Sequence, residues 1–408
     1  MKKVELLAPA GSLEKLIMAI LYGADAVYIG GEEYGLRASA DNFSLDDMQK
    51  GISFAHSHGK KVFLTMNIIP HNDDLKEMDQ YIKEVVNLGI DAIILSDPGV
   101  FSIVREAAPE IEIHLSTQAN NTNWRSAKFW YEHGVKRIIL ARELSLDEIR
   151  DIRSKLPEAL ELEMFVHGAM CISYSGRCLL SNYMAGRDSN KGYCAHPCRW
   201  KYYLMEEKRP GEYMPVYENE RGTFIYNSKD LCMLEYIPEI IESGITSLKI
   251  EGRMKSSYYV ATVVKAYREA IDAYYQNLEG YKFDTRLIEE VSKASHREYT
   301  TGFYLNKPTG NEQIYHTSSY IRDYDFIGVI TDYDKKTGIA TIEQRNRMRV
   351  GEEIEVVRPE GPYFLQKIKS MKNEELEEIE VAPHPQMKVY MPMDEDVPPY
   401  TMLRRISK

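Results

Sequence analysis

Eight short apolar runs, each followed by a stretch of helical periodicity, constrain this chain more than any other feature. The runs are VELLAPA, DAVYIG, KVFLTMN, DAIILSD, IEIHLSTQ, RIILARE, LEMFVHG and, after an interruption, SLKIEG. Strands that are hydrophobic almost throughout are typical of a parallel sheet covered on both faces. Eight strand-helix units predict an α/β fold, a closed (β/α)8 barrel of the TIM type. The alternative is an open doubly wound sheet, but neither GxGxxG nor GxxxxGKS/T follows any run.

Helix-start signals agree with this register. In RELSLDEI, Ser145 and Glu148 match the S-x-x-E pattern of a capping box directly after the sixth run. FSLDDM offers Ser44 and Asp47 in a similar way. After the eighth run, an apolar stripe at helical spacing predicts a helix packed on the barrel. The stripe consists of Val260, Val263, Tyr267, Ala270, Ile271 and Tyr274.

The chain divides into two predicted domains. Residues 1–315 hold the barrel units, and about 80 residues separate the seventh run from the eighth, far more than a usual strand-helix connection. We therefore expect an insertion at about 169–230, lying over the C-terminal face of the barrel, where active sites of such barrels are found. From about 320 to 408, short alternating runs separated by turn signals predict a small β-barrel.

Four of the five cysteines fall within 28 residues of this insertion, at Cys171, Cys178, Cys194 and Cys198. Structural zinc is usually held by paired C-x2-C knuckles, which the C-x6-C-x15-C-x3-C spacing does not match. A 4Fe-4S cluster also takes four thiolates and tolerates irregular spacing. The spacing favours the cluster and leaves zinc or inert thiols as alternatives.

The neighbours of the cysteines also favour a cluster. Gly168, Gly176 and Gly192 would let the backbone approach an inorganic core and turn amides toward its sulfurs. The fifth cysteine, Cys232, is expected to be a buried small hydrophobe, with the alternative that it replaces Cys198 as the fourth ligand.

The cysteine content and the net charge indicate the compartment of the protein and the kind of surface that could bind a nucleic acid. A cluster of cysteines in a reducing compartment is more typical of a metal or redox site than of disulfides, and the odd total of five cysteines agrees with this. The N-terminal MKKVELLAPAG lacks a sustained apolar run, and no later run approaches the roughly 18 residues of a membrane span. We expect a cytoplasmic protein with no membrane segment. Because the net charge is -11, any nucleic acid must bind to a local basic surface.

Polar residues at the ends of the predicted strands should face the barrel mouth. Arg142 lies at the end of the sixth run and Arg253 follows the eighth. Guanidinium groups clamp carboxylates, and structural salt bridges are the alternative for both arginines. His167, four residues before Cys171, is a candidate for proton transfer or for tuning the cluster, unless it is a structural histidine. The other candidates at strand ends are Glu251, Asn67, Asp97 and Gln118.

Two basic stretches could contact RNA. CRWKYY, from Cys198 to Tyr203, combines positive charge with stacking groups. QRNRMR places Arg345, Arg347 and Arg349 at alternate positions, which on a strand would share one face. A solvated strand face is the alternative for the second stretch.

The long pattern around the first cysteines resembles a known family. E-x-F-x-x-G-A-M-C-x4-G-x-C-x-L-S, from Glu163 to Ser181, resembles the signature of peptidase family U32. GADAVYIGG, NSKDL, SLKIEGRMKS and HREYTTGF are similar to further segments of that family, so the resemblance spans nearly the whole chain. Within the family, the chain is most similar to the branch that makes 5-hydroxyuridine at the wobble position of tRNA in a prephenate-dependent reaction linked to iron-sulfur assembly.

The resemblance implies a 4Fe-4S cluster on the insertion cysteines, tRNA and prephenate as substrates, and the iron-sulfur assembly machinery as a partner. Related branches hydroxylate ribosomal RNA or take part in ubiquinone hydroxylation. The rival classes of function are a peptidase and a non-catalytic partner subunit of a modification complex. The chain contains no HExxH, and SYSGR lacks the first glycine of a nucleophile elbow. Four clustered cysteines are better explained as metal ligands than as one nucleophile.

Overall fold

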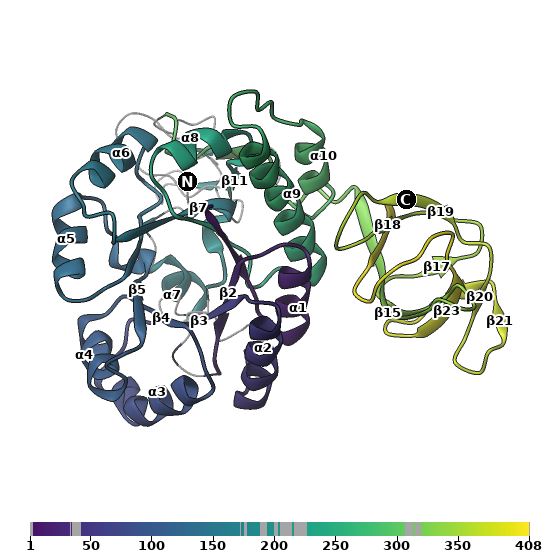
Figure 1. Ribbon diagram of the computed structural model, residues 1–408, viewed down its shortest axis with the longest axis horizontal. Coiled ribbons are helices and arrows are strands. Elements are labelled where there is room, and N and C mark those ends of the chain that lie inside the picture. Colours follow the sequence, from purple (N-terminus) through teal and green to yellow (C-terminus); the bar gives the residue numbers. More distant parts are fainter. Residues whose placement is uncertain are drawn as a thin grey trace.

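A closed parallel barrel dominates the molecule (Figure 1). The computed structural model describes residues 3–32, 34, 42–171, 173–174, 178–187, 194–199, 203–204, 214–215, 227–306, 313–314 and 320–407. The last strand pairs in parallel with both the first and the seventh, which closes the ring and confirms the predicted (β/α)8 fold. The barrel strands are β1 (Glu5–Pro9), β2 (Ala26–Gly30), β3 (Lys61–Met66), β4 (Ala92–Leu95), β5 (Glu112–Leu115), β6 (Arg137–Ile139), β7 (Glu161–Ala169) and β12 (Ser247–Ile250).

Helices alternate with these strands and cover the barrel (Figure 1). Ser44 caps the helix after β2, and Ser145 and Glu148 form the predicted capping box after β6. The predicted apolar stripe of the longest helix is buried throughout. The helices are α1 (Leu13–Leu21), α2 (Leu45–Ser57), α3 (Met78–Asn87), α4 (Pro98–Ala107), α5 (Trp124–Glu132), α6 (Leu146–Ser154), α8 (Ile237–Glu242), α9 (Ser257–Gln276) and α10 (Arg286–Ser292).

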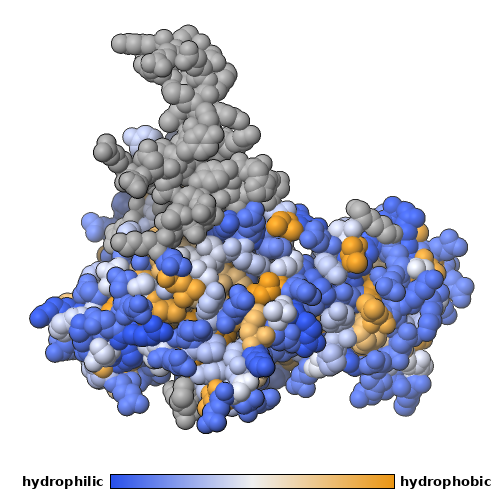
Figure 2. Space-filling model, turned by 90° about the horizontal axis from the view of Figure 1, so that it is seen from above, coloured by the Kyte–Doolittle hydropathy of each residue, from blue (hydrophilic) through white to orange (hydrophobic). Residues whose placement is uncertain are grey.

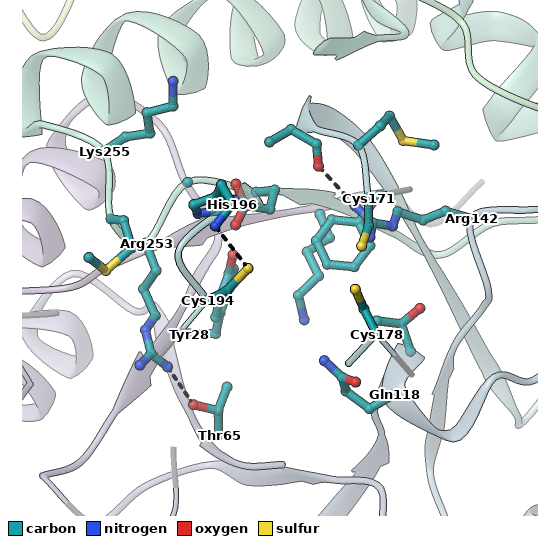
Figure 3. Close-up of a pocket in the computed structure, with 18 of the residues that line it drawn as sticks. Tyr28, Thr65, Gln118, Arg142, Cys171, Cys178, Cys194, His196, Arg253 and Lys255 are labelled. Carbon is teal, nitrogen blue, oxygen red and sulfur yellow. Dashed lines mark hydrogen bonds between the residues drawn. The ribbon is translucent and has the colours of Figure 1, made fainter. Parts of the chain in front are cut away.

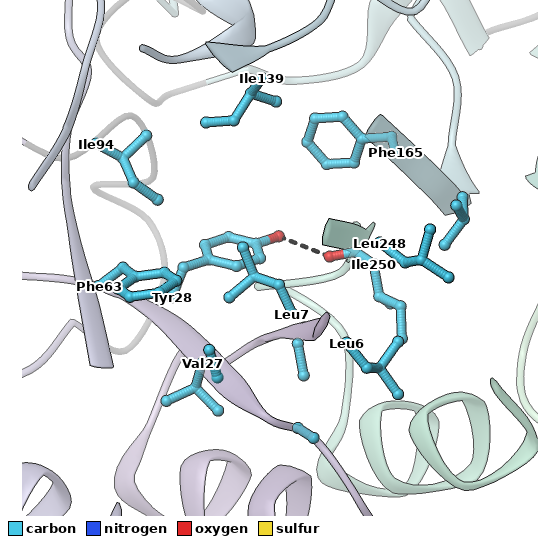
Figure 4. Packing of buried hydrophobic residues seen from close by; sticks show 14 of the residues in the cluster. Leu6, Leu7, Val27, Tyr28, Phe63, Ile94, Ile139, Phe165, Leu248 and Ile250 are labelled. Atoms are coloured by element: carbon cyan, nitrogen blue, oxygen red, sulfur yellow. Dashed lines mark hydrogen bonds between the residues drawn. The ribbon is translucent and has the colours of Figure 1, made fainter. Parts of the chain in front are cut away.

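Buried apolar side chains pack inside the barrel, as in other barrels of this type. Figure 4 shows Tyr28, Phe63, Ile94, Ile139 and Phe165 packed with their neighbours, and the Tyr28 hydroxyl donates to the carbonyl of Ile250 at 3.0 Å. The cavity described below lies above this packed layer, because Tyr28, Ile94, Ile139 and Phe165 also line it.

Two short strands outside the barrel extend its sheet at β7. β11 (Asp230–Cys232) runs antiparallel to the end of β7, and β13 (Tyr299–Thr300) pairs with β11. A short helix, α7 (Leu180–Ala185), and a helical turn, η4 (Pro197–Arg199), carry the residues around the cysteines. Gly168 lies in the left-handed region at φ +112°, and a Cβ atom there would be 2.7 Å from the carbonyl oxygen of Glu251. Glycine is therefore required at 168 by the neighbouring strand end.

The C-terminal domain is an antiparallel half-barrel with a core of its own. Its eight-stranded sheet has the order β19-β18-β24-β15-β16-β23-β20-β21. The strands are β15 (Tyr324–Asp334), β16 (Ile339–Gln344), β18 (Glu353–Val357), β19 (Phe364–Lys367), β20 (Met371–Lys372), β21 (Glu378–Ile379), β23 (Lys388–Pro392) and β24 (Met402–Ile406), with β17 (Met348–Arg349) and β22 (Val381–Ala382) paired separately.

The two domains share an interface that combines apolar packing with hydrogen bonds, since Val357 and Met402 pack into the core of the barrel domain. The hydroxyl of Tyr22, the residue after α1, lies 2.8 and 2.9 Å from the carbonyl oxygens of Val357 and Tyr400 and can donate to either. The fully buried Arg404 donates to Glu290 of α10 and to Glu355, both at 2.7 Å. Figures 1 and 2 show the domains side by side, and the described surface in Figure 2 is mostly hydrophilic. None of the described helices is long and apolar enough to cross a membrane.

Candidate active site

A cavity of about 610 Å³ opens at the C-terminal ends of the barrel strands (Figure 3). Its wall combines side chains of the barrel strands, the insertion and the segment that leads into the C-terminal domain. The C-terminal face is where a barrel brings together loops from different strands. The location therefore agrees with the expectation that the insertion lies over the mouth.

All four insertion cysteines line this one cavity. Figure 3 shows Cys171 and Cys178 on the side of Arg142, with Cys194 pointing toward them from the side of Arg253. None of the four cysteines forms a disulfide bond. Among the described residues, no three His, Cys, Asp or Glu side chains converge closely enough to hold a single metal ion. The thiols thus share a cavity while standing further apart than one tetrahedral metal requires.

The loop around the last two cysteines has geometry suited to a sulfur-bound group. The backbone N–H of His196 donates to Sγ of Cys194 at 3.4 Å, and His196 has a positive φ of 54°. The Ser181 hydroxyl of α7 accepts from the N–H of Ala195 at 2.9 Å, which ties the loop to the helix. Amide hydrogen bonds to cysteine sulfur are a means by which proteins tune iron-sulfur clusters.

Cys232 occupies a different place. It is buried on β11 opposite His167 and does not line the cavity. Burial raises the pKa of its thiol to about 11, so this sulfur remains protonated at neutral pH. This arrangement supports Cys198 over Cys232 as the fourth member of the cysteine set.

Arg253 is held against the neighbouring strands at the cavity wall. Its Nη1 donates to Oγ1 of Thr65 at 2.8 Å, and its Nη2 donates to Oδ1 of Asn42 at 3.2 Å. A Cβ atom at Gly30 would lie 2.4 Å from Nη1 of this guanidinium, so any side chain there would displace Arg253 from its present position. Arg142 lines the same cavity, donates to the carbonyl of Ala169 at 2.9 Å and lies over the Phe165 ring.

Lys249 is a cavity residue that the sequence analysis missed. Its ammonium lies 2.9 Å from Oε1 of Glu163 and 4.4 Å from the centre of the Tyr28 ring. The sequence did contain a pattern that could have predicted this position. Lys249 precedes Glu251 by two residues, and alternate residues of a strand share a face. Burial raises the pKa of Glu163, but attraction to Lys249 and Arg137 outweighs burial and leaves it at about 2.

Positive charge dominates the cavity. Its described lining residues include five cationic side chains and one carboxylate, that of Glu251. The arrangement can bind an anion, because guanidinium and ammonium groups form charge-assisted hydrogen bonds with carboxylate and phosphate oxygens. The five cations are Arg142, Lys249, Arg253, Lys255 and Arg322.

Comparison with known proteins identifies the family. The model of peptidase family U32 matches residues 11–314, and that of the U32 C-terminal domain matches residues 322–404. The chain belongs to peptidase family U32.

The U32 relatives carry two kinds of name. The tRNA hydroxylation protein P1 of Bacillus subtilis (strain 168) is 43% identical, with 99% of this chain and 95% of that protein covered. The tRNA hydroxylation protein P of Escherichia coli (strain K12) is 40% identical over 97% and 95% of the two chains. A collagenase of Porphyromonas gingivalis (strain ATCC BAA-308 / W83) is 32% identical over 99% and 98%.

His167 does not reach the cavity in this U32 chain, contrary to its expected place at the mouth. The register between β7 and β12 shifts at a bulge, so that Phe165 lies opposite Lys249 but His167 lies opposite Ile250. A bulge reverses the alternation of side chains, and the His167 ring lies among Tyr259, Tyr267 and Tyr299 instead. Burial, then the charges of Lys255 and His296, lower its pKa to about 3.

Of the remaining candidates at strand ends, some line the cavity and one does not. Asn67, Gln118 and Glu251 line the cavity as expected, and Nδ2 of Asn67 donates to Oγ of Ser116 at 3.3 Å. Asp97 does not line it. Instead, its carboxylate caps α4 by accepting from the N–H groups of Gly99 and Val100.

The structure tests only one of the two basic stretches. Trp200, Lys201 and Tyr202, like Gly176 and Gly192, lie outside the described residues, as do the side chains of Arg199 and Tyr203. The expectation that Arg345, Arg347 and Arg349 share one strand face is wrong. β16 ends at Gln344, and Arg345 pairs with Glu14 of the barrel domain at 3.0 Å and with Glu343 at 2.8 Å. Arg347 and Arg349 are exposed.

Proposed function

We propose that this protein hydroxylates a uridine of tRNA at the wobble position, with a 4Fe-4S cluster and prephenate. The observation that carries the proposal is the convergence of four cysteines and five cations on one cavity at the C-terminal face of the barrel. Thiols suit iron-sulfur ligation, and the cations suit a dicarboxylate or a phosphodiester. The names of the relatives with 40–43% identity support tRNA as the substrate.

The cysteines fit the cluster in their chemistry. Cys171, Cys178, Cys194 and Cys198 would hold it, and the amide of His196 already donates to one of the four sulfurs. Supply of the cluster would make the iron-sulfur assembly machinery a partner. When bound, the cluster would provide redox-active or Lewis-acidic iron beside the substrate.

The side chains of the cavity would bind and orient prephenate. Arg142, Lys249 and Arg253 are buried, so their charges act on a ligand with little screening by water. Arg253 is fixed by Thr65 and Asn42, and Lys249 by Glu163. Groups fixed in this way lose little conformational freedom when they bind a ligand. The two carboxylates of prephenate are suited to such a set of cations.

A peptidase is the second candidate, because a collagenase is 32% identical over nearly the whole chain. A cysteine nucleophile needs a nearby base that can take its proton. His167 is a poor base for this role, since it lies outside the cavity and its pKa is lowered to about 3 by burial and by Lys255 and His296. Four thiols around one cavity also exceed what a nucleophile needs.

Nucleoside mass spectrometry tests the proposal. tRNA from a deletion strain should lack 5-hydroxyuridine, and the wild-type gene should restore it while a Cys171→Ala gene should not. Purified, iron-loaded protein should then form the nucleoside on unmodified tRNA only when prephenate is added. An unchanged nucleoside profile in the deletion strain, together with gelatin cleavage by the purified protein, would favour the peptidase instead.

A further inference from the structure

The segment between the two domains is part of the cavity wall. Tyr320 and Arg322 both line the cavity, although they lie beyond the barrel units in sequence. Ile321 between them forms a backbone bridge with His296, with N–H to oxygen contacts of 2.8 and 3.3 Å. This segment is therefore fixed to the barrel at the cavity.

Two cations contact the ring of Tyr320. The Lys255 ammonium lies 4.0 Å from the centre of its ring, and the Arg297 guanidinium lies 4.3 Å from it. Lys255 also donates to the carbonyl of Ser295 at 3.4 Å. Cation–π contacts of this kind place an aromatic ring and a positive charge together. Lys255, Tyr320 and Arg322 are called the rim below.

The cations of the cavity differ in depth. Arg142, Lys249 and Arg253 are 8%, 4% and 3% exposed, whereas Lys255 is half-buried and Arg322 is exposed. Figure 3 shows Lys255 at the edge of the cavity, pointing away from the cysteines. Within the described part of the chain, Arg322 has no ion-pair or hydrogen-bond partner. A small dicarboxylate bound inside the cavity would contact the buried cations Arg142, Lys249 and Arg253. The rim could then bind a second anion that stays partly in solvent.

We infer that the rim is the docking surface for the phosphate backbone of the RNA next to the nucleotide that enters the cavity. The inference rests on the proposed function and adds which residues hold the polymer. A chain with a net charge of -11 offers RNA no general attraction, so unpaired local charge at the mouth must provide it. Arg322 is exposed and Lys255 is half-buried at the cavity, and cationic side chains of this kind bind the phosphates of RNA. The segment leading into the C-terminal domain thus contributes directly to substrate binding.

Salt-dependent binding of unmodified tRNA tests the rim. Each phosphate contact adds about 0.9 to the slope of log affinity against log salt in duplexes and about 0.7 in single strands. Arg322→Gln should therefore weaken binding on the order of fivefold near physiological salt and lower the slope by roughly one contact. The double variant Lys255→Gln/Arg322→Gln should lower it by about two. Prephenate affinity, measured by calorimetry, should not change in Arg322→Gln.

Lys335→Gln is the charge-matched control, because Lys335 is exposed in the turn after β15 and does not line the cavity. Arg322→Gln should keep the wild-type melting temperature, since its side chain is exposed. If wild type binds tRNA and Arg322→Gln matches Lys335→Gln in affinity and slope, the rim is not the docking surface. If wild type binds no tRNA but binds gelatin through Arg322, the proposed function itself fails and the rim serves a peptide.

Discussion

Arg253 donates a 2.8 Å hydrogen bond to the Thr65 hydroxyl, joining the loop after β12 to strand β3 across the mouth of the barrel. Both side chains are nearly fully buried, at 3% and 4% exposure. The hydroxyl in turn donates to the carbonyl of Ile29 at 2.8 Å. The position of the guanidinium therefore depends on a residue that carries no charge itself.

Thr65→Val should weaken prephenate binding. The substitution keeps the shape of the side chain but removes the acceptor for Arg253, which is a loss of about 1 kcal/mol and roughly fivefold in Kd. Calorimetric titration of the iron-loaded protein measures it. Thr262→Val is the matched control, since the buried Thr262 hydroxyl has no hydrogen-bond partner in the described structure. Equal affinities for wild type and Thr65→Val would contradict an anchoring role.

Iron binding should depend on the cavity cysteines and not on Cys232. Anaerobically purified wild type should contain about four irons and four acid-labile sulfides per chain. The variant Cys171→Ala/Cys178→Ala should lose both together with the visible absorption. Cys232→Ala should retain them, because that sulfur lies outside the cavity. Loss of iron in Cys232→Ala alone would reverse the assignment of the fourth ligand.

The Glu163 carboxylate should stabilise the barrel when the pH is above the pKa that Glu163 has in the unfolded chain. This contribution should be lost in acid. Burial raises its pKa, but Lys249 and Arg137 lower it further, from 4.5 to about 2. The contribution is therefore fully present above pH 4.5 and is lost as pH falls toward 2. Glu163→Gln should cost about 3–5 kcal/mol at pH 7, because it leaves buried cations short of a partner. Urea unfolding measures this, with the exposed Glu132→Gln as control; equal costs for the two variants would count against the network.

His167 should make the protein sensitive to mild acid. Burial, with Lys255 and His296, lowers its pKa from 6.5 to about 3. Above pH 6.5 the imidazole is neutral in both states, and below it only the unfolded state takes up the proton, so stability falls with pH. Between pH 7.5 and 5 the loss due to this residue is about 2 kcal/mol. His167→Gln should reduce the measured loss by that amount, whereas the exposed His133→Gln should not.

Activity of a His167 variant separates the two roles considered for this residue. If His167 transfers a proton, His167→Ala should abolish hydroxylation while the iron content stays intact. If its role is to pack among the tyrosines, His167→Gln should turn over normally once folded. Normal turnover of His167→Gln would remove this residue from the mechanism.

Local patterns in the sequence predicted the barrel and the cysteine set. Continuous apolar runs marked all eight strands, because a strand covered on both faces needs apolar side chains on both. The capping box at Ser145 and the apolar stripe of α9 could also be predicted, because each depends on residues within one turn or on one face of a helix. The four cavity cysteines were readable because they lie close together along the chain.

The place of His167 could not be read from the sequence. Strand alternation puts Glu163, Phe165 and His167 on one face, but the bulge between β7 and β12 turns His167 outward. A bulge depends on how two strands 80 residues apart pair, and no local pattern marks it. The same limit explains why Asp97, a polar residue at a strand end, turned out to cap α4.

By itself, then, the sequence determined which segments become strands and helices and which residues could bind metal, because burial and periodicity are properties of neighbouring residues. Only the tertiary structure decided what the cavity contains. Lys249 meets Glu163 across 86 residues, and Tyr320 and Arg322 reach the mouth from the segment between the domains. These contacts depend on barrel closure and strand register, which bring side chains together in space regardless of their distance along the chain.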